Sequence, residues 1–208
     1  MEPSALVPVI DDVWRWSVWN EPRKLWFNGH LLRIGDAAIL VDPVAVTEDV
    51  AEAIDEAGAR CGRWLCVITN ADHSRAAEQM RERFGAQIWI ARGDAERAEL
   101  AALAPDDTID DGDVICGVKI VRIPDVKTPG EIALYWVARR ALVVGDAAIG
   151  RPSGALSMLA PEKFRDPAAA RASVAKLAAL GVDIVLVGDG DDLLTGGGAA
   201  LAAIGGGG

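Results

Sequence analysis

The sequence predicts an α/β (α+β) protein built as a four-layer αββα sandwich, in which two β-sheets face each other and helices cover the outer face of each. Two observations lead to this prediction. Segments with strand and helix patterns alternate along both halves of the 208-residue chain, and a sheet must bury its apolar face against another layer. Several strands are also uninterrupted apolar runs, which is typical of strands covered on both faces. We expect residues 1–208 to form one domain.

The first half of the chain predicts a hairpin followed by alternating helices and strands. Val13–Trp19 alternates in hydropathy, with Trp14, Trp16 and Val18 on one side, as in a strand buried on one face. Thr47 is a typical helix N-cap, and glycines are typical helix ends. The segments expected here are Gly29–Ile34 paired with Ala37–Val41, a helix from Thr47 to Gly58, the strand Trp64–Ile68, the helix Ser74–Phe84, the strand Ile88–Ala91 and the helix Asp94–Leu103.

The second half predicts a second sheet with its own helices. Thr108–Ile123 has the pattern of antiparallel strands, broken at Asp111-Gly112-Asp113 and at Gly117. The segments expected after it are a hairpin of Ile132–Val137 and Ala141–Gly145, the amphipathic helix Pro167–Leu180, the buried strand Val182–Val187 and the terminal helix Thr195–Ile204. Gly205–Gly208 is expected to be a flexible tail.

Composition narrows the classes of partner. A formal net charge of -10 and a pI of about 4.7 argue against nucleic acid and against an anionic membrane. Met1-Glu2-Pro3-Ser4 has no signal-peptide pattern, and no segment approaches the roughly 20 apolar residues of a membrane span. The expected compartment is the cytoplasm. Cys61, Cys66 and Cys116 are interpreted as small buried hydrophobes, because their number is odd and no Cys-x-x-Cys pair is present.

Polar clusters follow four of the predicted strands at the point where each strand ends. The most informative one is Asn70-Ala71-Asp72-His73-Ser74-Arg75, which follows the apolar run Trp64–Ile68 and Thr69. Strand ends of this kind line the ligand crevice of α/β sheets. The other three clusters are Asp125–Glu131, Gly145-Asp146 and Gly188–Asp192. In each, glycine lets the backbone come close while a polar side chain projects.

Taken in order, these clusters resemble the markers of the metallo-β-lactamase-fold superfamily, from about Trp14 to Ile204. The resemblance indicates a hydrolase-like protein with the four-layer fold. Gly29-His30-Leu31-Leu32 with Ile39–Pro43 resembles the opening hairpin and its Asp turn, and Thr69 with Asp72-His73 resembles the Thr-His-x-His-x-Asp-His motif. Asp110–Asp113 then precedes Lys127-Thr128-Pro129-Gly130, which resembles His-Thr-Pro-Gly. Val144-Gly145-Asp146 resembles the segment of the bridging Asp, and Gly188-Asp189-Gly190 resembles Gly-His-Gly.

The resemblance implies metal chemistry, but the histidines of the first metal position are missing. In this family two metal ions, usually zinc, activate a hydroxide for attack on an ester, thioester, lactam or phosphoester. Here the main motif is two residues short, Asn70 is the only polar residue near its missing histidines, and Lys127 stands at the third histidine. The set implied for one divalent metal (Zn, Mn or Fe) is Asp72, His73, Asp146 and Asp189, with Asn70 as a further oxygen ligand.

Lys127 carries the alternative interpretation. An ammonium group has donors and no lone pair, so it cannot bind a metal. Placed where a metal ion would lie, it offers a positive charge to Asp72 and Asp146. The two function hypotheses are therefore a single-metal hydrolase of a small ester, thioester or related substrate, and a metal-free, catalytically inactive relative whose cleft only binds a ligand. Asp72 and Lys127 are the candidate catalytic residues.

Each candidate also has a structural interpretation. Asp72 and His73 could cap the following helix, Asp146 could hold neighbouring loops, and Asp189 could be a turn residue. Arg75, Glu131 and His30 are candidate substrate-binding residues. Their alternatives are a helix-surface salt bridge of Arg75 with Glu78 or Glu82, a surface ion pair for Glu131, and a satisfied core or rim position for His30. Tryptophans 14, 16, 19 and 26 are expected in the core, with a buried inter-subunit patch or a substrate-facing patch as the alternative. The expected partner is a small molecule, and a homo-oligomer is left open.

Overall fold

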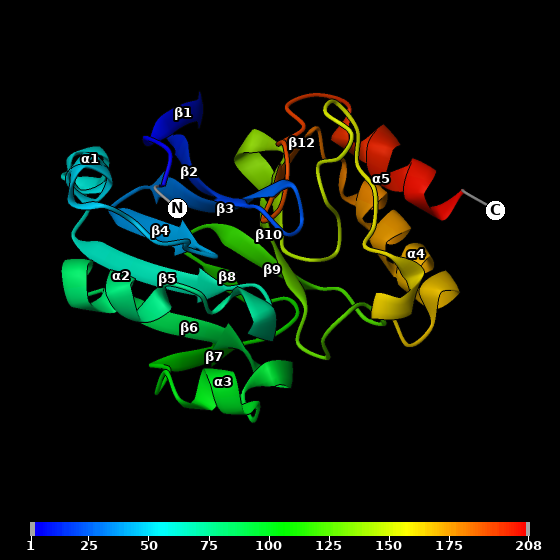
Figure 1. The fold of residues 1–208 in the computed structure, drawn as a ribbon, viewed down its shortest axis with the longest axis horizontal. Helices are drawn as coiled ribbons and strands as arrows, with labels where there is room; N and C mark the ends of the chain where they lie inside the picture. The colour runs from blue at the N-terminus through cyan, green and yellow to red at the C-terminus, as the bar shows by residue number, and fades with distance from the viewer. Residues whose placement is uncertain (1–2, 207–208) are drawn as a thin grey trace.

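The computed structural model describes residues 3–206 and contains two β-sheets (Figure 1). The first sheet has seven strands in chain order: β1 Val7–Ile10, β2 Val13–Asn20, β3 Leu25–Ile34, β4 Ala37–Val41, β5 Arg63–Ile68, β6 Gln87–Ala91 and β7 Asp107–Ile109. The second sheet has the order β12-β11-β10-β9-β8, from β8 Val114–Ile115, β9 Val118–Arg122, β10 Ile132–Trp136, β11 Ala141–Val144 and β12 Ile184–Val187.

Helices lie on the outer side of each sheet (Figure 1). The α-helices are α1 Glu48–Gly58, α2 Ala77–Phe84, α3 Ala98–Ala101, α4 Pro167–Lys176 and α5 Gly197–Gly205. Short 3-10 turns are η1 Ala71–His73, η2 Arg92–Asp94, η3 Val137–Arg139, η4 Pro161–Lys163 and η5 Leu177–Leu180. In Figure 1 the first three α-helices lie beside the seven-stranded sheet, and α4 and α5 lie together beyond the second sheet.

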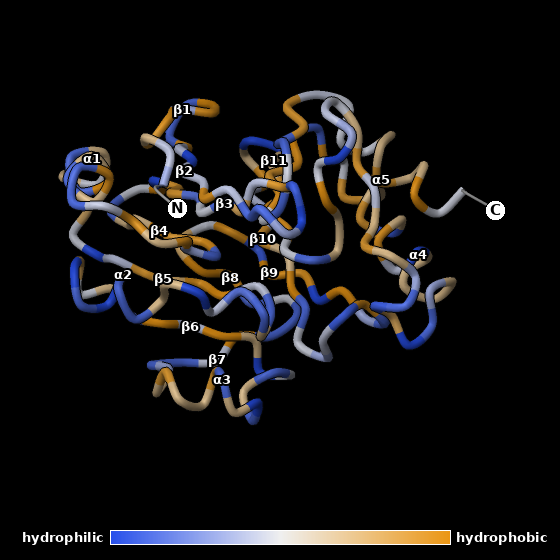
Figure 2. Tube along the Cα trace, in the orientation of Figure 1, coloured by the Kyte–Doolittle hydropathy of each residue, from blue (hydrophilic) through white to orange (hydrophobic). Residues whose placement is uncertain are grey.

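Three apolar cores separate the four layers. In β4, Ile39 points into the core between the two sheets, whereas Leu40 points into the core under α1 and α2. Successive residues of a strand face opposite sides of the sheet, so an all-apolar strand serves both cores. A third core lies between the second sheet and α4 and α5, and includes Leu142 and Val174. Figure 2 shows the hydrophobic strands at the centre of the molecule. The predicted four-layer αββα architecture is confirmed.

The alternation of the tryptophan-rich strand is explained by this layering. Trp16 is fully buried in the core under α1, and Trp14 and Val18 pack against the same core. The indole nitrogen of Trp16 donates to the carbonyl of Val44 at 2.9 Å, which satisfies its polar atom. Trp26 lies further along the hairpin and is 40% exposed, in edge-to-face contact with Trp19. The four tryptophans are therefore divided between the core and the surface.

Strand direction brings the polar clusters together. The pairs β4–β5, β5–β6 and β11–β12 are parallel, so the loops after these strands lie at the carboxyl ends of the two sheets. A hydrogen bond from the amide of Ile132 to the carbonyl of Thr69 joins the two sheets at this edge (2.9 Å). Ligand crevices of α/β sheets lie at such strand ends.

Several predicted boundaries are corrected. The segment Thr108–Ile123 does not form one set of antiparallel strands, because its first part, β7, pairs in parallel with β6 in the other sheet. The helix predicted from Ser74 begins at Ala77, since η1 and a turn come first. The helix predicted over Asp94–Leu103 is reduced to the four residues of α3, and Pro167–Leu180 ends in the 3-10 turn η5. Tertiary packing decides how much of a predicted helix forms, and a local sequence pattern does not show this.

Some predictions concern the chain ends and the membrane. The predicted glycine tail is partly within α5, which ends at Gly205, and Gly207 and Gly208 lie outside the described residues. Met1 and Glu2, on which the signal-peptide prediction partly depends, also lie outside them. Within residues 3–206, none of the helices combines the length and the apolar character needed to cross a membrane.

Candidate functional site

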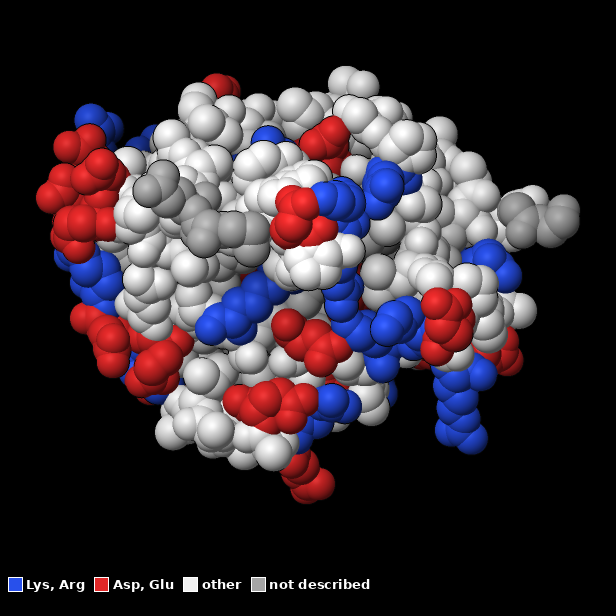
Figure 3. All heavy atoms as spheres, in the orientation of Figure 1, with Lys and Arg blue, Asp and Glu red and all other residues white. Residues whose placement is uncertain are grey.

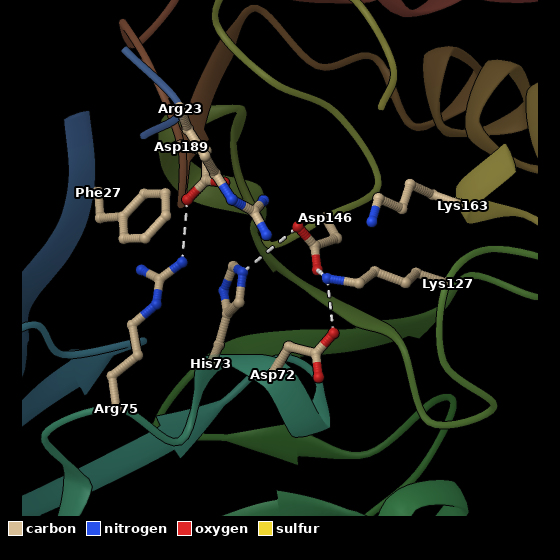
Figure 4. Close-up of a pocket in the computed structure, with 9 residues that line it drawn as sticks. All are labelled: Arg23, Phe27, Asp72, His73, Arg75, Lys127, Asp146, Lys163 and Asp189. Atoms are coloured by element: carbon tan, nitrogen blue, oxygen red, sulfur yellow. Dashed lines mark hydrogen bonds and ion pairs between the residues drawn. The ribbon is translucent and has the colours of Figure 1, made fainter. Parts of the chain in front are cut away.

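A cavity of about 320 Å³ opens where the carboxyl ends of the two sheets meet. Figure 4 shows the nine side chains that line it: Arg23, Phe27, Asp72, His73, Arg75, Lys127, Asp146, Lys163 and Asp189. On the face seen in Figure 3, Lys and Arg side chains are mixed with Asp and Glu side chains around the middle, while Asp and Glu are dense at the edge over α1. Five of the predicted site residues, Asp72, His73, Arg75, Lys127 and Asp146, are thus brought together, and Asp189 joins them.

Asp42, which follows β4, fixes the positions of Thr69 and His73. Its carboxylate accepts hydrogen bonds from the amide and the hydroxyl of Thr69, at 2.8 and 2.5 Å. The same group contacts Nδ1 of His73 at 2.7 Å. Gly188 makes this arrangement possible, because a Cβ atom there would lie 2.6 Å from Cε1 of His73. Asp42 therefore fixes both the end of β5 and the orientation of the imidazole.

The loop after β5 presents Asp72 and His73 to the cavity. The side-chain oxygen of Asn70 accepts a hydrogen bond from the amide of Asp72 (2.9 Å) and so caps η1. His73 is buried, whereas the side chain of Asp72 is 38% exposed. The interpretation that Asp72 or His73 caps the following helix is wrong, because α2 has Ala76 as its N-cap and no side-chain cap. Asp72 itself points to the cavity (Figure 4).

His73 lies between two carboxylates. Its Nδ1 contacts Asp42 at 2.7 Å and its Nε2 lies 3.6 Å from Asp146. Burial and the nearby guanidinium of Arg75 oppose a positive charge, but the two carboxylates outweigh them and raise the pKa of His73 to about 10. His73 is therefore an imidazolium at neutral pH, with donors on both nitrogens and no free lone pair.

Lys127 lies between Asp72 and Asp146. Its Nζ is 2.5 Å from Oδ2 of Asp72 and 2.6 Å from Oδ2 of Asp146. Burial opposes the charge, but the two carboxylates prevail and raise the pKa of Lys127 above its usual value. Asp146 is buried, which by itself would raise its pKa, yet its bonds to His73 and Lys127 hold the pKa well below the usual range. Lys127 and Asp146 are therefore both charged at neutral pH.

Arg75 and Asp189 form the opposite side of the cavity. The guanidinium of Arg75 contacts Oδ1 of Asp189 at 2.9 Å and lies 4.5 Å from the centre of the Phe27 ring. Asp189 is buried and is not an exposed turn residue. The alternative that Arg75 pairs with Glu78 or Glu82 on the helix surface is wrong, because the partner of Glu78 is Arg81. The true partner of Arg75 lies more than a hundred residues along the chain.

Glu131 lies behind the cavity and does not line it. It is fully buried, so the interpretation as a surface ion pair is wrong. One carboxyl oxygen accepts from the amide of Ala147 at 3.1 Å. Burial, reinforced by the charge of Asp146, raises the pKa of Glu131 well above its usual value. A Cβ at Gly145 would lie 3.1 Å from Oε1 of Glu131 and only 2.2 Å from Oγ1 of Thr69, so this glycine permits the close packing.

His30 lies away from the cavity. It is buried on β3, and its Nε2 contacts Oδ1 of Asp192 at 3.2 Å. Asp192 also pairs with Arg15 at 2.9 Å and accepts from the amide of Val187 at 3.0 Å. The structure therefore places His30 in a buried hydrogen-bonded group that joins β3 to the loop after β12. A ligand in the cavity does not contact His30, because this side chain does not line it.

Three positions that line the cavity or hold its loops were missed from the sequence. Asp94, at the end of η2, is fully buried and holds two loops, accepting from the amide of Ala71 (3.0 Å), the hydroxyl of Thr128 (2.6 Å) and the amide of Gly130 (2.9 Å). It thereby places Lys127 opposite Asp72. Arg23 and Lys163 line the cavity from loops. Asp94 comes shortly after the strand β6, and this position at a strand end could have indicated a site residue. No local sequence pattern indicates that Arg23 and Lys163 line the cavity.

The side chains present do not fit a metal ion. Lys127 and Arg75 are cations that direct donors at the carboxylates a metal would use, and His73 has both nitrogens engaged. Across residues 3–206, no three His, Cys, Asp or Glu side chains converge in a way that could hold a metal ion. The nine lining residues also include no hydroxyl or thiol. The arrangement is suited to binding through charge, and it offers no activated nucleophile of its own.

Comparisons with known proteins agree on the family. A sequence profile described as the metallo-beta-lactamase superfamily matches residues 9–205. A hydroxyacylglutathione hydrolase of Acidiphilium cryptum (strain JF-5) is 32% identical over 165 residues, which is 78% of this chain but only 61% of that protein. The chain thus spans about three-fifths of the length of this relative.

Solved structures agree on the fold. A metallo-beta-lactamase from Pontibacter korlensis superposes with a TM-score of 0.72 at 14% identity, covering 98% of this chain and 99% of that one. The DIM-1 metallo-beta-lactamase superposes with a TM-score of 0.75 at 13% identity, covering 99% and 97%. At such low identity these likenesses concern the fold alone.

Proposed function

The chain belongs to the metallo-beta-lactamase superfamily, and we propose that it is a metal-independent, hydrolase-like member whose cleft binds a small-molecule ligand. In this proposal the ammonium of Lys127 replaces the charge of a metal ion. The single observation that supports it most is the position of Lys127 Nζ, 2.5 Å from Asp72 and 2.6 Å from Asp146. Clustered carboxylates need a cation, and here a side chain of the protein supplies it.

The rest of the cavity supports the same proposal. Each buried carboxylate that lines it has a positively charged neighbour, Asp146 with His73 and Lys127 and Asp189 with Arg75. A metal ion would have to displace these pairs and leave an ammonium or a guanidinium beside a dication, which is electrostatically unfavourable. Under this proposal Asp72 and Lys127 hold the cleft together electrostatically and do not activate water.

A second candidate is hydrolysis of a small ester or thioester with one divalent metal at Asp72, His73, Asp146 and Asp189. The observation that favours it is the relative named as a hydroxyacylglutathione hydrolase. This candidate requires Lys127 to leave its two carboxylates. It also requires His73 to give up a proton, which a pKa of about 10 makes costly at neutral pH.

The test is the metal content of protein purified without chelator and without added metal, measured by elemental analysis. We expect far less than one equivalent of zinc, manganese or iron per chain. About one equivalent of a transition metal, lost in the variant Asp72→Ala, would contradict the proposal and favour the single-metal hydrolase. Glu78→Ala is a matched control, because Glu78 is an acidic side chain outside the cavity.

A further inference from the structure

Two of the cations that line the cavity have no carboxylate partner. Arg23 lies in the turn between β2 and β3, and Lys163 ends η4 before α4. In the part of the chain that the structure describes, neither side chain lies within salt-bridge distance of an Asp or Glu, and both are exposed. Figure 4 shows both side chains directed into the cavity from the side opposite Arg75 and His73.

Within residues 3–206, the acids near these two cations in the sequence form no ion pair with them. Glu21 interacts with Lys24 and accepts from the indole of Trp19 at 2.6 Å, so it does not neutralise Arg23. Asp166 caps α4 through the amides of Ala168 and Ala169, both at 3.0 Å, and Glu162 is exposed next to Lys163 in the sequence; within residues 3–206 neither acid forms an ion pair with Lys163. The carboxylates inside the cavity are also paired. The charges of Arg23 and Lys163 are therefore in excess.

The charge balance of the cavity reverses that of the whole protein. Four Lys and Arg side chains line the cavity and only three carboxylates do. The protein as a whole carries a net charge of -10. At physiological ionic strength charges act over a Debye length of about 8 Å, so a ligand inside the cavity experiences mainly the lining residues.

A neighbouring hollow shows that this excess is local. It adjoins the cavity at Lys127 and is lined by Arg122 and Arg165 but also by Asp125 and Asp166, so its own charges balance. Lys127 contributes little excess charge to it, because its ammonium is held by Asp72 and Asp146. Among these two hollows, only the cavity of Figure 4 has cations left over.

We propose that this cavity binds a small anionic ligand, with a carboxylate or phosphate group held between Arg23 and Lys163. The inference rests on the proposed ligand-binding function and adds the chemical class of the ligand. Guanidinium and ammonium groups both form charge-assisted hydrogen bonds to such oxygens. The cavity volume of about 320 Å³ is at the small end of ligand sites, which limits the ligand to a small molecule. Phe27, contacted by Arg23 and Arg75, offers an apolar wall for its carbon skeleton.

The test measures binding of inorganic phosphate and of succinate by calorimetry, at low and at high ionic strength. The variant Arg23→Ala/Lys163→Ala should weaken binding of the recognised anion by about tenfold or more, since it removes two charge-assisted contacts. The control Arg60→Ala/Lys176→Ala removes the same charge from exposed positions outside the cavity and should bind as the wild type does. Arg23→Lys/Lys163→Arg keeps both charges and should retain binding.

Each outcome decides the inference. If phosphate binds more tightly than succinate and only the alanine variant loses this binding, the inference is supported and the ligand class is a phosphate ester. If succinate binds more tightly than phosphate and only the alanine variant loses this binding, the inference is supported and the ligand class is a carboxylate. Absence of binding for both anions, or equal weakening in the control, overturns it. Far-ultraviolet circular dichroism confirms that each variant is folded. Metal analysis of the same preparations separates the two proposals. Stoichiometric metal contradicts metal independence. Metal-free protein that binds neither anion contradicts only the proposed ligand class.

Discussion

Glu131 and Asp146 are two buried carboxyl groups whose pKa values are shifted in opposite directions. Asp146 contacts Lys127 and His73, and its pKa is held well below the usual range. Within residues 3–206, Glu131 accepts a hydrogen bond from a backbone amide and has no cation in contact, and burial raises its pKa well above the usual value. Burial acts on both, so the cations make the difference. The cations in contact with Asp146 therefore favour its charged form, whereas burial disfavours the charged form of Glu131 behind the cavity.

The largest effect is expected when the cation of Asp146 is removed. Lys127→Met leaves Asp146 and Asp72 without an ammonium, and breaking a buried ion pair in this way should cost about 3 kcal/mol of unfolding free energy at pH 7. Urea denaturation measures it. The double variant Lys127→Met/Asp146→Asn should recover part of the loss, because it also removes the uncompensated charge. A loss below about 0.5 kcal/mol would place Lys127 among ordinary surface ion pairs.

The next effect is a pH dependence that comes from His73. Its pKa is raised from 6.5 to about 10 in the folded protein. The group therefore contributes stability that is fully present below pH 6.5 and is lost as the pH rises through 10. Relative to His73→Gln, the wild type should lose about 1.4 kcal/mol or more between pH 6 and pH 10, the value of one pKa unit. A difference that is constant across this range, measured in urea at several pH values, would show that folding does not raise the pKa of His73.

Replacing Glu131 should change the pH dependence of the unfolding free energy less than replacing His73 does. Because the folded pKa of Glu131 is raised above 4.5, the stability it contributes is fully present below pH 4.5 and is lost as the pH rises through the raised value. Glu131→Gln mimics the protonated acid. It should match the wild type near pH 4 and become more stable than it by about 1 kcal/mol at pH 8. A variant less stable at pH 8 than at pH 4, relative to wild type, would show that Glu131 is ionised.

The smallest effect is expected at Asp72, the exposed partner of Lys127. Its side chain is 38% exposed, so water screens the pair and Asp72→Asn should cost about 0.5 kcal/mol. The loss should shrink further at high salt. If Asp72→Asn costs as much as Asp146→Asn in thermal or urea unfolding, the two carboxylates share the ammonium equally.

The parts of the fold that the sequence predicts are those with strong local patterns. Ala37–Val41 and Ile184–Val187 are apolar runs, and both are buried strands. The pattern around Thr108 was misread, because β7 pairs with β6 in the other sheet and no local signal shows a change of sheet. Helix starts were misplaced at Ser74 for a similar reason, since η1 is shaped by Asp42 and Asp94 from distant loops.

The same limit applies to the site. The approach of Lys127 to Asp72 and Asp146 was expected, because the family resemblance aligns Lys127 with a metal-binding histidine. The partners of Arg75 and His30 were not, since Asp189 and Asp192 lie far along the chain. The burial of Glu131 was missed because its neighbours in the sequence, Gly130 and Ile132, do not show that Asn70 and Ala147 close over it.

The replacement of a metal charge by Lys127 is tested most directly by the zinc dependence of unfolding, compared between wild type and Lys127→Met. A ligand that binds only the folded protein stabilises it by mass action. We predict that zinc leaves the unfolding free energy of the wild type unchanged and stabilises Lys127→Met, because the variant leaves Asp72 and Asp146 without a cation. Stabilisation of the wild type by zinc, equal to or greater than that of the variant, would contradict the account.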